Sequence, residues 1–273
     1  MKWIQGDKFK TLAKYQYAPD APEEKSVSAY DNLQNTLDIK ALEDMDIIYT
    51  HKFYVRQLFQ LIRDVYKRLI LITHNSDCNI DDTYLLPENI IVWHTQNVNT
   101  INPRIQSIPI GLENDRWFPQ VQKKSKMLEK LKERQNIRNL VYMNHNITTN
   151  PIKRLHLYEL FKNRVWVTSA RGVNGEGFDE YLDNIYNHDF VICPEGNGMD
   201  THRTWECLYM NTIPIEKRNI NNQFYTDLPI CFVDEWEEVT EDFLKSEWQR
   251  INSTNWNYEK LDFKYWEKWI GGI

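Results

Sequence analysis

Short apolar runs that alternate with helix-like segments constrain the fold of this chain most strongly. Residues 52–67, "KFYVRQLFQLIRDVYK", have apolar side chains at helical spacing. The apolar runs of the first half are "DIIYTH" (46–51), "RLILITHNSD" (68–77), "NIIVWHTQN" (89–97) and "IQSIPIGLEN" (105–114). Continuous apolar runs between helices are typical of parallel strands covered on both faces. The pattern predicts an α/β fold with parallel sheets, after an irregular beginning.

A second series of the same kind follows residue 139. Its helical segments begin at Pro151, near Gly177 and after Asp200. Its apolar runs are "LVYMNHN" (140–146), "RVWVTSA" (164–170), "DFVICPEG" (189–196), "TIPIE" (212–216) and "LPICFVD" (228–234). We therefore expect one domain over 1–115, a second over 116–255, and a tryptophan-rich helical end whose residues 256–273 pack back on the first.

The basic segment "QKKSKMLEKLKERQNIRN" (122–139) lies between the two series. A solvated helix at a domain junction is the better interpretation, and a nucleic-acid patch the weaker one. The formal net charge of the 273 residues is −6, which also argues against nucleic acid as the main partner. A local phosphate pocket remains compatible with this charge, because a few donors suffice.

The four cysteines show no CxxC pair or other zinc spacing. Cys193 and Cys231 lie within apolar runs, so we expect buried thiols and not a disulfide. No signal peptide opens the sequence, and no apolar run is long enough for a membrane span. These features predict a soluble protein of the cytoplasm, which for a viral chain means the host cytoplasm.

The strand ends indicate where a ligand would bind. In open parallel sheets, ligands bind beyond the carboxyl ends of the strands. In three runs of the first half the expected strand ends in histidine: "YTH" at His51, "ITH" at His74 and "VWH" at His94. Runs of the second half end in "MNHN", in "TSARG", which contains Ser169, and in "CPEGNG". We expect a cleft between the halves, with imidazoles and acids on one wall and amides and glycines on the other.

The stretch "FVICPEGNGMDTHRTWECLYMNTIPIE" (190–216) predicts a strand, a glycine turn, a helix start and a second strand. Gly196 and Gly198, on either side of Asn197, allow a ligand to approach the backbone closely. Asp200 or Thr201 is a natural N-cap for the helix that follows. The motif is neither a Walker A loop nor a dinucleotide G-x-G-x-x-G.

Two charged residues of this helix suggest phosphate chemistry. Arg203 lies in the first turn, where helix amides already favour an anion. Glu206 follows three residues later and shares its face. A diphosphate on Arg203 and the amides, with a sugar hydroxyl on Glu206, would use these groups. The alternative is a plain i,i+3 ion pair between the two side chains.

A second helix start follows the run 140–146. In "NHNITTNPIKR" (144–154), Asn150 or Thr149 can cap a helix whose first position is Pro151. Arg154 then projects from the first turns of that helix. Alone it is more readily an exposed helix arginine. Two arginines at helix starts, both at strand carboxyl ends of one sheet, make it less attractive to explain Arg154 as an exposed residue and Arg203 as a plain ion pair at the same time.

Residues 190–216 resemble the signature of exostosin-like glycosyltransferases, the family 47 type. Members read approximately F-x-x-C-P-x-G-x-G-x-D-T-H-R-x-W-E-A-x-x-x-G-x-I-P-V at this place. The pattern N-x-x-T-N-x-x-x-R from Asn146 to Arg154 and "IPIGLEN" (108–114) are similar to short members of the group. The sequence departs from the pattern at Glu195, where a basic residue is common, and at Asn211, where glycine is common.

The resemblance implies a GT-B architecture, in which two Rossmann-like domains face each other and the second holds a nucleotide-sugar. It also implies inversion at the anomeric carbon without an essential metal or other cofactor. By position, Arg203 would meet the diphosphate and Glu206 the ribose, while Arg154 compensates for the acid at 195. The expected donor-binding set is Arg154, Ser169, Glu195, Gly196, Asn197, Gly198, Thr201, Arg203 and Glu206.

Displacement at a sugar carbon needs a base that takes the proton of the acceptor hydroxyl. We expect it on the wall opposite the donor. His74 and Asp77 in "THNSD" are the first candidates for the catalytic residues. His51 and His94 are the acceptor-side candidates behind them. Each histidine alone is also compatible with a hydrogen-bonded strand-end residue.

Three other function classes are alternatives to this interpretation. A metal-dependent GT-A transferase needs an Asp-x-Asp after a strand, whereas "DMD" (44–46) precedes one. A hydrolase is a poor fit, because there is no G-x-S-x-G elbow and no sign that Glu195 and Glu206 face each other across a bond. A non-catalytic nucleotide or carbohydrate-binding module stays open as an alternative.

The sequence thus leads to one expectation about function. It predicts an inverting hexosyl- or pentosyltransferase that moves a sugar from a nucleotide-sugar to a hydroxyl of a glycan. The donor is expected to be a UDP-sugar, and small pentose-transferring members of the resembling group suggest UDP-xylose. The acceptor, the linkage and the oligomeric state have no signal in the sequence.

Overall fold

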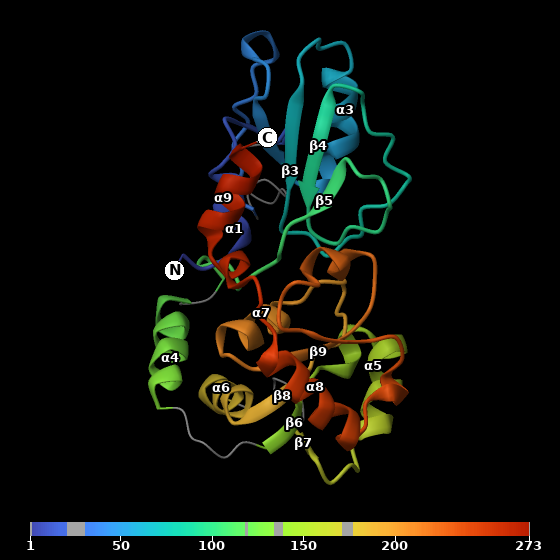
Figure 1. Ribbon diagram of the computed structural model, residues 1–273. Helices are drawn as coiled ribbons and strands as arrows, with labels where there is room; N and C mark the ends of the chain where they lie inside the picture. The colour runs from blue at the N-terminus through green and yellow to red at the C-terminus, as the bar shows by residue number, and fades with distance from the viewer. Residues whose placement is uncertain (1, 21–30, 118–119, 134–138, 171–176, 273) are drawn as a thin grey trace. The chain divides into compact units, whose positions relative to one another are not determined.

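The computed structural model describes residues 2–20, 31–117, 120–133, 139–170 and 177–272. The chain divides into two compact units. Unit 1 comprises Met1–Ile110 and Asp262–Ile273, and unit 2 comprises Gly111–Leu261. Each unit is built on its own five-stranded parallel sheet with helices beside it (Figure 1). The expected α/β class with two parallel sheets is confirmed.

Unit 1 has its strands in sequence order across the sheet, β1-β2-β3-β4-β5. All four neighbouring pairs are parallel. The strands are β1 (Tyr15–Tyr17), β2 (Ile47–Thr50), β3 (Leu69–Thr73), β4 (Ile90–Thr95) and β5 (Ile105–Ser107). The helices and 3-10 turns are α1 (Gly6–Lys10), η1 (Ile39–Ala41), η2 (Lys52–Tyr54), α3 (Val55–Ile62) and α9 (Phe263–Gly271).

The irregular beginning expected before residue 46 is wrong for α1 and β1. The strand "YQY" (15–17) is short, and two of its three residues are only half-buried. Its extended form depends on pairing with β2, where Tyr15 lies opposite Ile48 and Tyr17 opposite Thr50. A strand stabilised by a partner more than thirty residues away leaves little local signal in the sequence.

Two adjacent residues of β4 show how the faces of this sheet are covered. Successive strand side chains point to opposite faces. Trp93 contacts Phe59 of α3, with ring centroids 5.8 Å apart, and His94 contacts Trp269 of α9 at 4.8 Å. The helices α3 and α9 therefore cover opposite faces of the sheet, as Figure 1 also shows.

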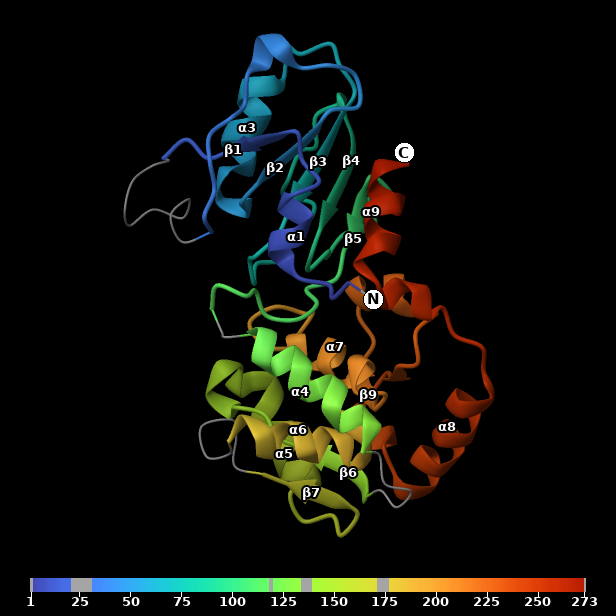
Figure 2. The same cartoon turned by 90° about the vertical axis from the view of Figure 1, so that its left-hand side faces the viewer.

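The beginning and the end of the chain meet within unit 1. The Phe9 ring of α1 lies edge-on to the Phe263 ring of α9, with centroids 5.1 Å apart. The backbone N–H of Phe263 donates to the carbonyl of Lys2 at 2.8 Å, and the N–H of Lys2 donates to Asp262 Oδ1 at 3.1 Å. These contacts fasten α9 beside α1 (Figure 2).

Unit 2 has the strand order β10-β9-β8-β6-β7, again with parallel neighbours throughout. The strands are β6 (Asn139–Met143), β7 (Val167–Ser169), β8 (His188–Ile192), β9 (Ile213–Lys217) and β10 (Cys231–Val233). The helices are α4 (Gln120–Lys132), α5 (Pro151–Phe161), α6 (Phe178–Tyr186), α7 (His202–Tyr209) and α8 (Glu241–Ser253). The 3-10 turns are η3 (Ile147–Thr149), η5 (Asn221–Tyr225), η6 (Trp236–Glu238) and η7 (Tyr258–Leu261).

The sheet of unit 2 is covered on both faces because its direction of winding reverses. One core joins Val141 of β6 and Phe190 of β8 to Leu157 of α5 and Leu244 of α8. On the other face, Tyr142 of β6 contacts Tyr181 of α6, with ring centroids 6.5 Å apart. Right-handed crossovers place helices on opposite faces when the strand order reverses, which explains this arrangement.

The cysteines and helices agree with two further expectations. All four cysteines are free thiols, and Cys193 and Cys231 are buried as expected. Of the helices in the described ranges, none combines the length and the apolar composition that a membrane crossing requires.

Candidate functional site

The strand order of unit 2 identifies one place where a ligand can enter between two loops. From β6 the chain passes to β7 on one side, and it then returns to β8 on the other side of β6. The loops after β6 (144–150) and after β8 (193–201) therefore diverge at the carboxyl ends of two neighbouring strands. Such reversal points are the usual ligand sites of open parallel sheets. The strands described in unit 1 show no such reversal, since they follow one another in sequence order.

Arg154 holds these two loops together. It lies on α5, whose first residue is Pro151 and whose N-cap is Asn150, as the sequence predicts. Its side chain is buried and its Nε donates to the carbonyl of Glu195 at 2.8 Å. Its Nη1 donates to the carbonyl of Asn146 at 2.9 Å, and Nη2 to that of Pro194 at 3.4 Å. The alternative of an exposed helix arginine is therefore wrong.

The glycine turn follows the course that the sequence predicts. The carbonyl of Gly196 accepts from Asn150 Nδ2 at 2.8 Å, and its N–H donates to the carbonyl of Gly198 at 3.0 Å. A Cβ at position 196 would lie 3.2 Å from Arg154 Nη2. Glycine therefore lets the loop approach the guanidinium closely. Gly198 is buried, and Asn197 between the two glycines is exposed.

Arg203 is the second residue of α7 and is half-buried. Its Nε donates to the hydroxyl of Tyr181 at 3.5 Å, and its guanidinium carbon lies 5.8 Å from the centre of the Tyr181 ring. Within the described part of the chain, no carboxylate pairs with Arg203. The i,i+3 ion pair between Arg203 and Glu206 is therefore not formed.

Glu206 has other partners for both of its oxygens. Its Oε1 lies 2.5 Å from Lys123 Nζ of α4, and its Oε2 accepts from Tyr181 Oη at 2.6 Å. The carboxylate and the ammonium are both buried. Burial alone would raise the pKa of Glu206, but the charge and hydrogen bond of Lys123 lower it below its usual value. Glu206 is thus ionised, and Lys123 compensates its charge.

The helix α4 is attached to α6 by a row of further ion pairs. Lys126 Nζ lies 2.6 Å from Asp179 Oδ1, and Lys130 pairs with Asp183. Lys124 is buried and pairs with Asp115 at 2.5 Å. The expectation of a solvated helix is therefore wrong for Lys123 and Lys124. Figure 2 shows α4 beside α6; the end of the predicted basic segment, 134–138, lies outside the described residues.

Positive charge gathers where the two loops meet. Burial, followed by the charge of Arg203, lowers the pKa of Arg154 to about 10. Burial, followed again by the charge of Arg203, lowers the pKa of His145 to about 4. His145 is buried, and its Nε2 is 3.3 Å from the carbonyl of Arg154. Two arginines and a neutral histidine therefore share this place, and an anion is the ligand that such a cluster favours.

Sequence reasoning did not select His145 as a site residue. Its position directly after β6, in "MNHN", was the available signal. Its Nδ1 is buried and has no hydrogen-bond partner among the residues that the structure describes. Because Nε2 faces a carbonyl oxygen, that nitrogen carries the proton and Nδ1 is an acceptor.

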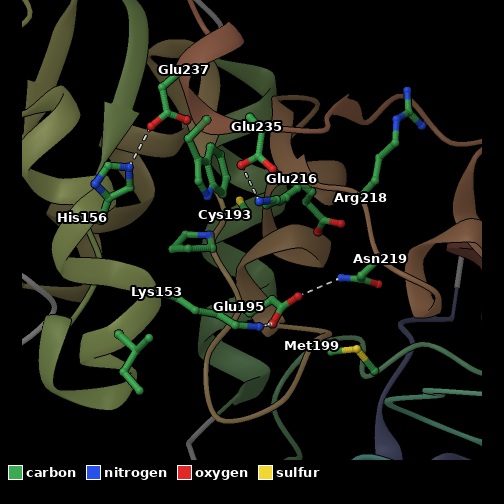
Figure 3. Close-up of a pocket in the computed structure, with 14 residues that line it drawn as sticks. Lys153, His156, Cys193, Glu195, Met199, Glu216, Arg218, Asn219, Glu235 and Glu237 are labelled. Carbon is green, nitrogen blue, oxygen red and sulfur yellow. Dashed lines mark hydrogen bonds and ion pairs between the residues drawn. The ribbon is translucent and has the colours of Figure 1, made fainter.

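The structure explains how an acid can occupy position 195. The Glu195 carboxylate pairs with Lys153 of α5, and its Oε1 accepts from Asn219 Nδ2 at 3.1 Å. Figure 3 shows these two contacts beside a cavity of about 380 Å³ that Glu195 helps to line. Lys153 thus compensates the negative charge of the Glu195 side chain beside the cavity. The backbone carbonyl of Glu195 accepts a hydrogen bond from Arg154.

Glu216, the last residue of β9 but one, lines the same cavity (Figure 3). Its oxygens accept from Thr204 Oγ1 and, at 3.2 Å, from Asn222 Nδ2. Burial, aided by the neighbouring acids Asp200 and Glu195, raises the pKa of Glu216 to about 8. Sequence reasoning missed this residue, although it closes the stretch 190–216. An acid at the end of an apolar strand was the signal.

Two other residues of the expected donor set have smaller roles in the geometry. Thr201 is the N-cap residue of α7, but its side chain makes no capping bond and lies 3.5 Å from Thr204 Oγ1. Asp200, the alternative cap, accepts instead from Trp205 Nε1 at 2.8 Å. Ser169 ends the edge strand β7 and is exposed. Residues 171–176, which begin with the last two residues of "TSARG", lie outside the described residues.

The two residues expected to supply the catalytic base lie after β3 in unit 1. His74 is buried and stacks on Phe9, with ring centroids 5.2 Å apart. Its Nε2 is 3.0 Å from the carbonyl of Pro109, and its Nδ1 accepts from the N–H of Asn75 at 2.8 Å. Asp77, three residues on, is exposed. Of His74 and Asp77, it is therefore Asp77 whose side chain has access to solvent.

The acceptor-side candidates of unit 1 are both buried. His51 caps η2 by accepting from the N–H of Phe53 at 3.3 Å, and burial lowers its pKa to about 4. His94 is fully buried, and burial lowers its pKa to about 3. Within the described ranges neither ring nitrogen of His94 has a hydrogen-bond partner. Both imidazoles are therefore neutral at neutral pH.

The Asp-x-Asp at 44–46 precedes β2, as the sequence predicts. Asp44 pairs with Arg68 and Asp46 with Lys14, with shortest nitrogen–oxygen distances of 2.5 and 2.9 Å. Among the residues described, no three or more histidines, cysteines or acids are grouped as metal ligands.

A comparison with known protein families finds none that matches this sequence, and a search of curated proteins finds no match either. The exostosin-like resemblance of residues 190–216 therefore remains a prediction, and the geometry of unit 2 supplies the basis for a proposal.

Proposed function

We propose that the chain is an inverting glycosyltransferase of the GT-B type that uses a nucleotide-sugar donor. The observation that supports this most is the charge of Arg203. Its neighbour Glu206 forms its ion pair with Lys123, so among the described residues no carboxylate lies within ion-pair distance of the guanidinium. A half-buried arginine without an ion-pair partner among the described residues, at the reversal point of a parallel sheet, favours an anionic ligand.

The surrounding groups suit a diphosphate. The Thr201 side chain makes no capping bond, which leaves the first turn of α7 open to a ligand oxygen. Arg154 adds a second positive charge while its donors hold the loops at 146 and 194–195. In this proposal Arg203 binds the diphosphate, and Arg154 shapes the loop and adds to the field.

In this proposal Glu206 binds the ribose of the donor. A carboxylate offers about four acceptor positions on its two oxygens. Lys123 and Tyr181 occupy one on each oxygen. A ribose hydroxyl would add a further bond to a carboxylate that is already ionised and fixed. Burial and the nearby carboxylate keep the pKa of Tyr181 well above its ordinary value, so its hydroxyl remains a donor.

The transfer itself needs a leaving group that is stabilised and an acceptor that loses a proton. Positive charge at Arg203 and Arg154 would stabilise the departing diphosphate. Asp77 is the exposed member of the expected base pair, so we propose it as the group that accepts the proton of the glycan hydroxyl. Inversion follows from a single displacement. The UDP-sugar donor and the independence from metal remain expectations from the resemblance.

Release of nucleoside diphosphate from a panel of nucleotide-sugars tests the proposal. UDP-xylose, UDP-glucose, UDP-galactose and GDP-sugars are incubated with the protein, with and without glycan acceptors and a chelator. We expect release from one donor class, loss of release in Arg203→Ala, and persistence with chelator. A protein that binds a donor without releasing diphosphate would be the non-catalytic module. Binding of none of these donors would contradict the proposal.

A further inference from the structure

We propose that Lys123 is a positioning residue that keeps Arg203 available for its anionic ligand by neutralising Glu206. The inference rests on the proposed function of Arg203 as the diphosphate-binding group. Lys123 belongs to α4, outside every motif of the resemblance. Its role is assigned by its contacts: it does not touch the proposed ligand but acts on the arginine through Glu206.

The spacing of Arg203 and Glu206 creates a competition. Residues three apart on a helix are neighbours on one face, and opposite charges at this spacing attract. A buried carboxylate without a partner is costly, so Glu206 requires a cation. If that cation were Arg203, the guanidinium would be neutralised and lost to a ligand. Lys123 Nζ, at 2.5 Å from Oε1, supplies the cation from another helix.

The position of Lys123 is fixed from several sides. Its ammonium lies 4.8 Å from the centre of the Phe178 ring, a cation–π distance. Lys126 and Lys130 lie on the same face of α4, three and seven residues further on, and pair with Asp179 and Asp183 of α6. These outer pairs are more exposed than the inner pair. They hold α4 in the register that places Lys123 at Glu206.

Tyr181 completes the separation of the two charges. Its hydroxyl donates to Glu206 Oε2 at 2.6 Å and accepts from Arg203 Nε at 3.5 Å. The tyrosine thus lies between the carboxylate and the guanidinium, and the strong donor Lys123 lies on the other carboxylate oxygen. At this helix start, Glu206 thus has a cation as its ion-pair partner, whereas Arg203 has no carboxylate within ion-pair distance among the described residues.

Inorganic diphosphate is the probe, because it has no ribose and so does not depend on Glu206 as a ligand. Its affinity is measured by calorimetry for wild type, Lys123→Met, Glu206→Gln and the double variant Lys123→Met/Glu206→Gln. Removal of Lys123 should free Glu206 to pair with Arg203 and weaken diphosphate binding about tenfold. Removal of both charges should restore the affinity to about twofold of wild type. Lys132→Met, which changes an exposed lysine at the end of α4, is the matched control and should bind as wild type does.

The outcomes separate this inference from the proposed function. Wild type that binds neither diphosphate nor UDP contradicts the proposed function itself. Wild-type binding together with unchanged binding in Lys123→Met overturns the role of Lys123, as does a double variant as weak as the single one. Should Lys123→Met fail to fold, Glu206→Gln decides: its uncompensated Lys123 should leave diphosphate binding equal or tighter, and weaker binding overturns the inference.

Discussion

Lys123 Nζ lies 2.5 Å from Glu206 Oε1 across 83 residues of sequence, and both side chains are buried in unit 2. This pair separates the charge of Glu206 from that of Arg203 on the same helix. It connects α4 to α7, two helices that the strand pattern alone does not relate. The stability of unit 2 should depend on the pair, because a buried charge that loses its partner is strongly unfavourable.

Lys123→Met should lower the free energy of unfolding by about 3 kcal/mol, the low end for a broken buried ion pair, because Arg203 can replace only part of the charge that Glu206 loses. Lys123→Met/Glu206→Gln should lose clearly less than the sum of the two single changes. Urea unfolding of wild type, the two single variants Lys123→Met and Glu206→Gln, and the double variant measures the energetic coupling between the two side chains. Additive losses would mean that the two side chains contribute independently, contrary to the contact described.

Arg154→Ala should lower the free energy of unfolding by about 3 kcal/mol, because three backbone carbonyls lose a charged donor. Arg154→Lys should recover little of this, since an ammonium lacks the planar fork that reaches the carbonyls of Asn146, Pro194 and Glu195. Hydrogen exchange should show faster exchange in the loops 144–150 and 193–201. Full recovery in Arg154→Lys would contradict a role that depends on the fork.

Three buried histidines should make the fold sensitive to acid. The pKa values of His51, His94 and His145 are lowered from 6.5 to about 4, 3 and 4, chiefly by burial. The unfolded chain therefore binds more protons below pH 6.5, and stability is lost as the pH falls from there towards the folded-state values. Each histidine should contribute a loss on the order of 3 kcal/mol by pH 4.

His94 offers the cleanest check of this acid sensitivity. Because its nitrogens make no hydrogen bond within the described ranges, His94→Leu should keep the stability at pH 7 and reduce the loss between pH 6.5 and 4. Melting temperatures of wild type and His94→Leu across that range give the difference. Parallel pH profiles for the two proteins would show that His94 is not buried as a neutral imidazole.

Glu216 should have the opposite pH dependence. Its pKa is raised from 4.5 to about 8, first by burial. The neutral form is thus favoured by the fold, and its contribution is present below pH 4.5 and lost as the pH rises through 8. As the pH rises from 5 to 9, wild type should therefore lose stability relative to Glu216→Gln. The difference between their urea midpoints measures this change. A constant difference over that range would contradict the raised pKa.

Much of the fold could be predicted from the sequence because the strands are continuous apolar runs. The predicted runs 68–77 and 189–196 cover β3 and all but the first residue of β8, and they extend into the loops that follow these strands. The helix starts at Pro151 and after Thr201 were likewise predicted, since proline and a polar cap are local signals. The strand at Tyr15–Tyr17 was not, because its extended form depends on a distant partner.

The site was predictable in its parts but not in its pairings. Arg154 and Arg203 were found from helix-start chemistry, and the acid at Glu195 was left unexplained. Its partner Lys153 lies 42 residues away on another helix, and the partner of Glu206 lies 83 away. Pairings over such separations are set by how α4 and α5 pack. No local sequence pattern within α4 or α5 indicates these pairings.

The most direct test of the account is the binding of UDP to wild type and Arg203→Ala, measured by isothermal titration calorimetry. Arg164→Ala, which changes an exposed arginine just before β7, is the matched control. The account predicts that Arg203→Ala weakens UDP binding by about 2–3 kcal/mol, the scale of a charged hydrogen bond, while Arg164→Ala binds as wild type does. Equal UDP affinity in wild type and Arg203→Ala would contradict the central claim that Arg203 is the anion-binding residue.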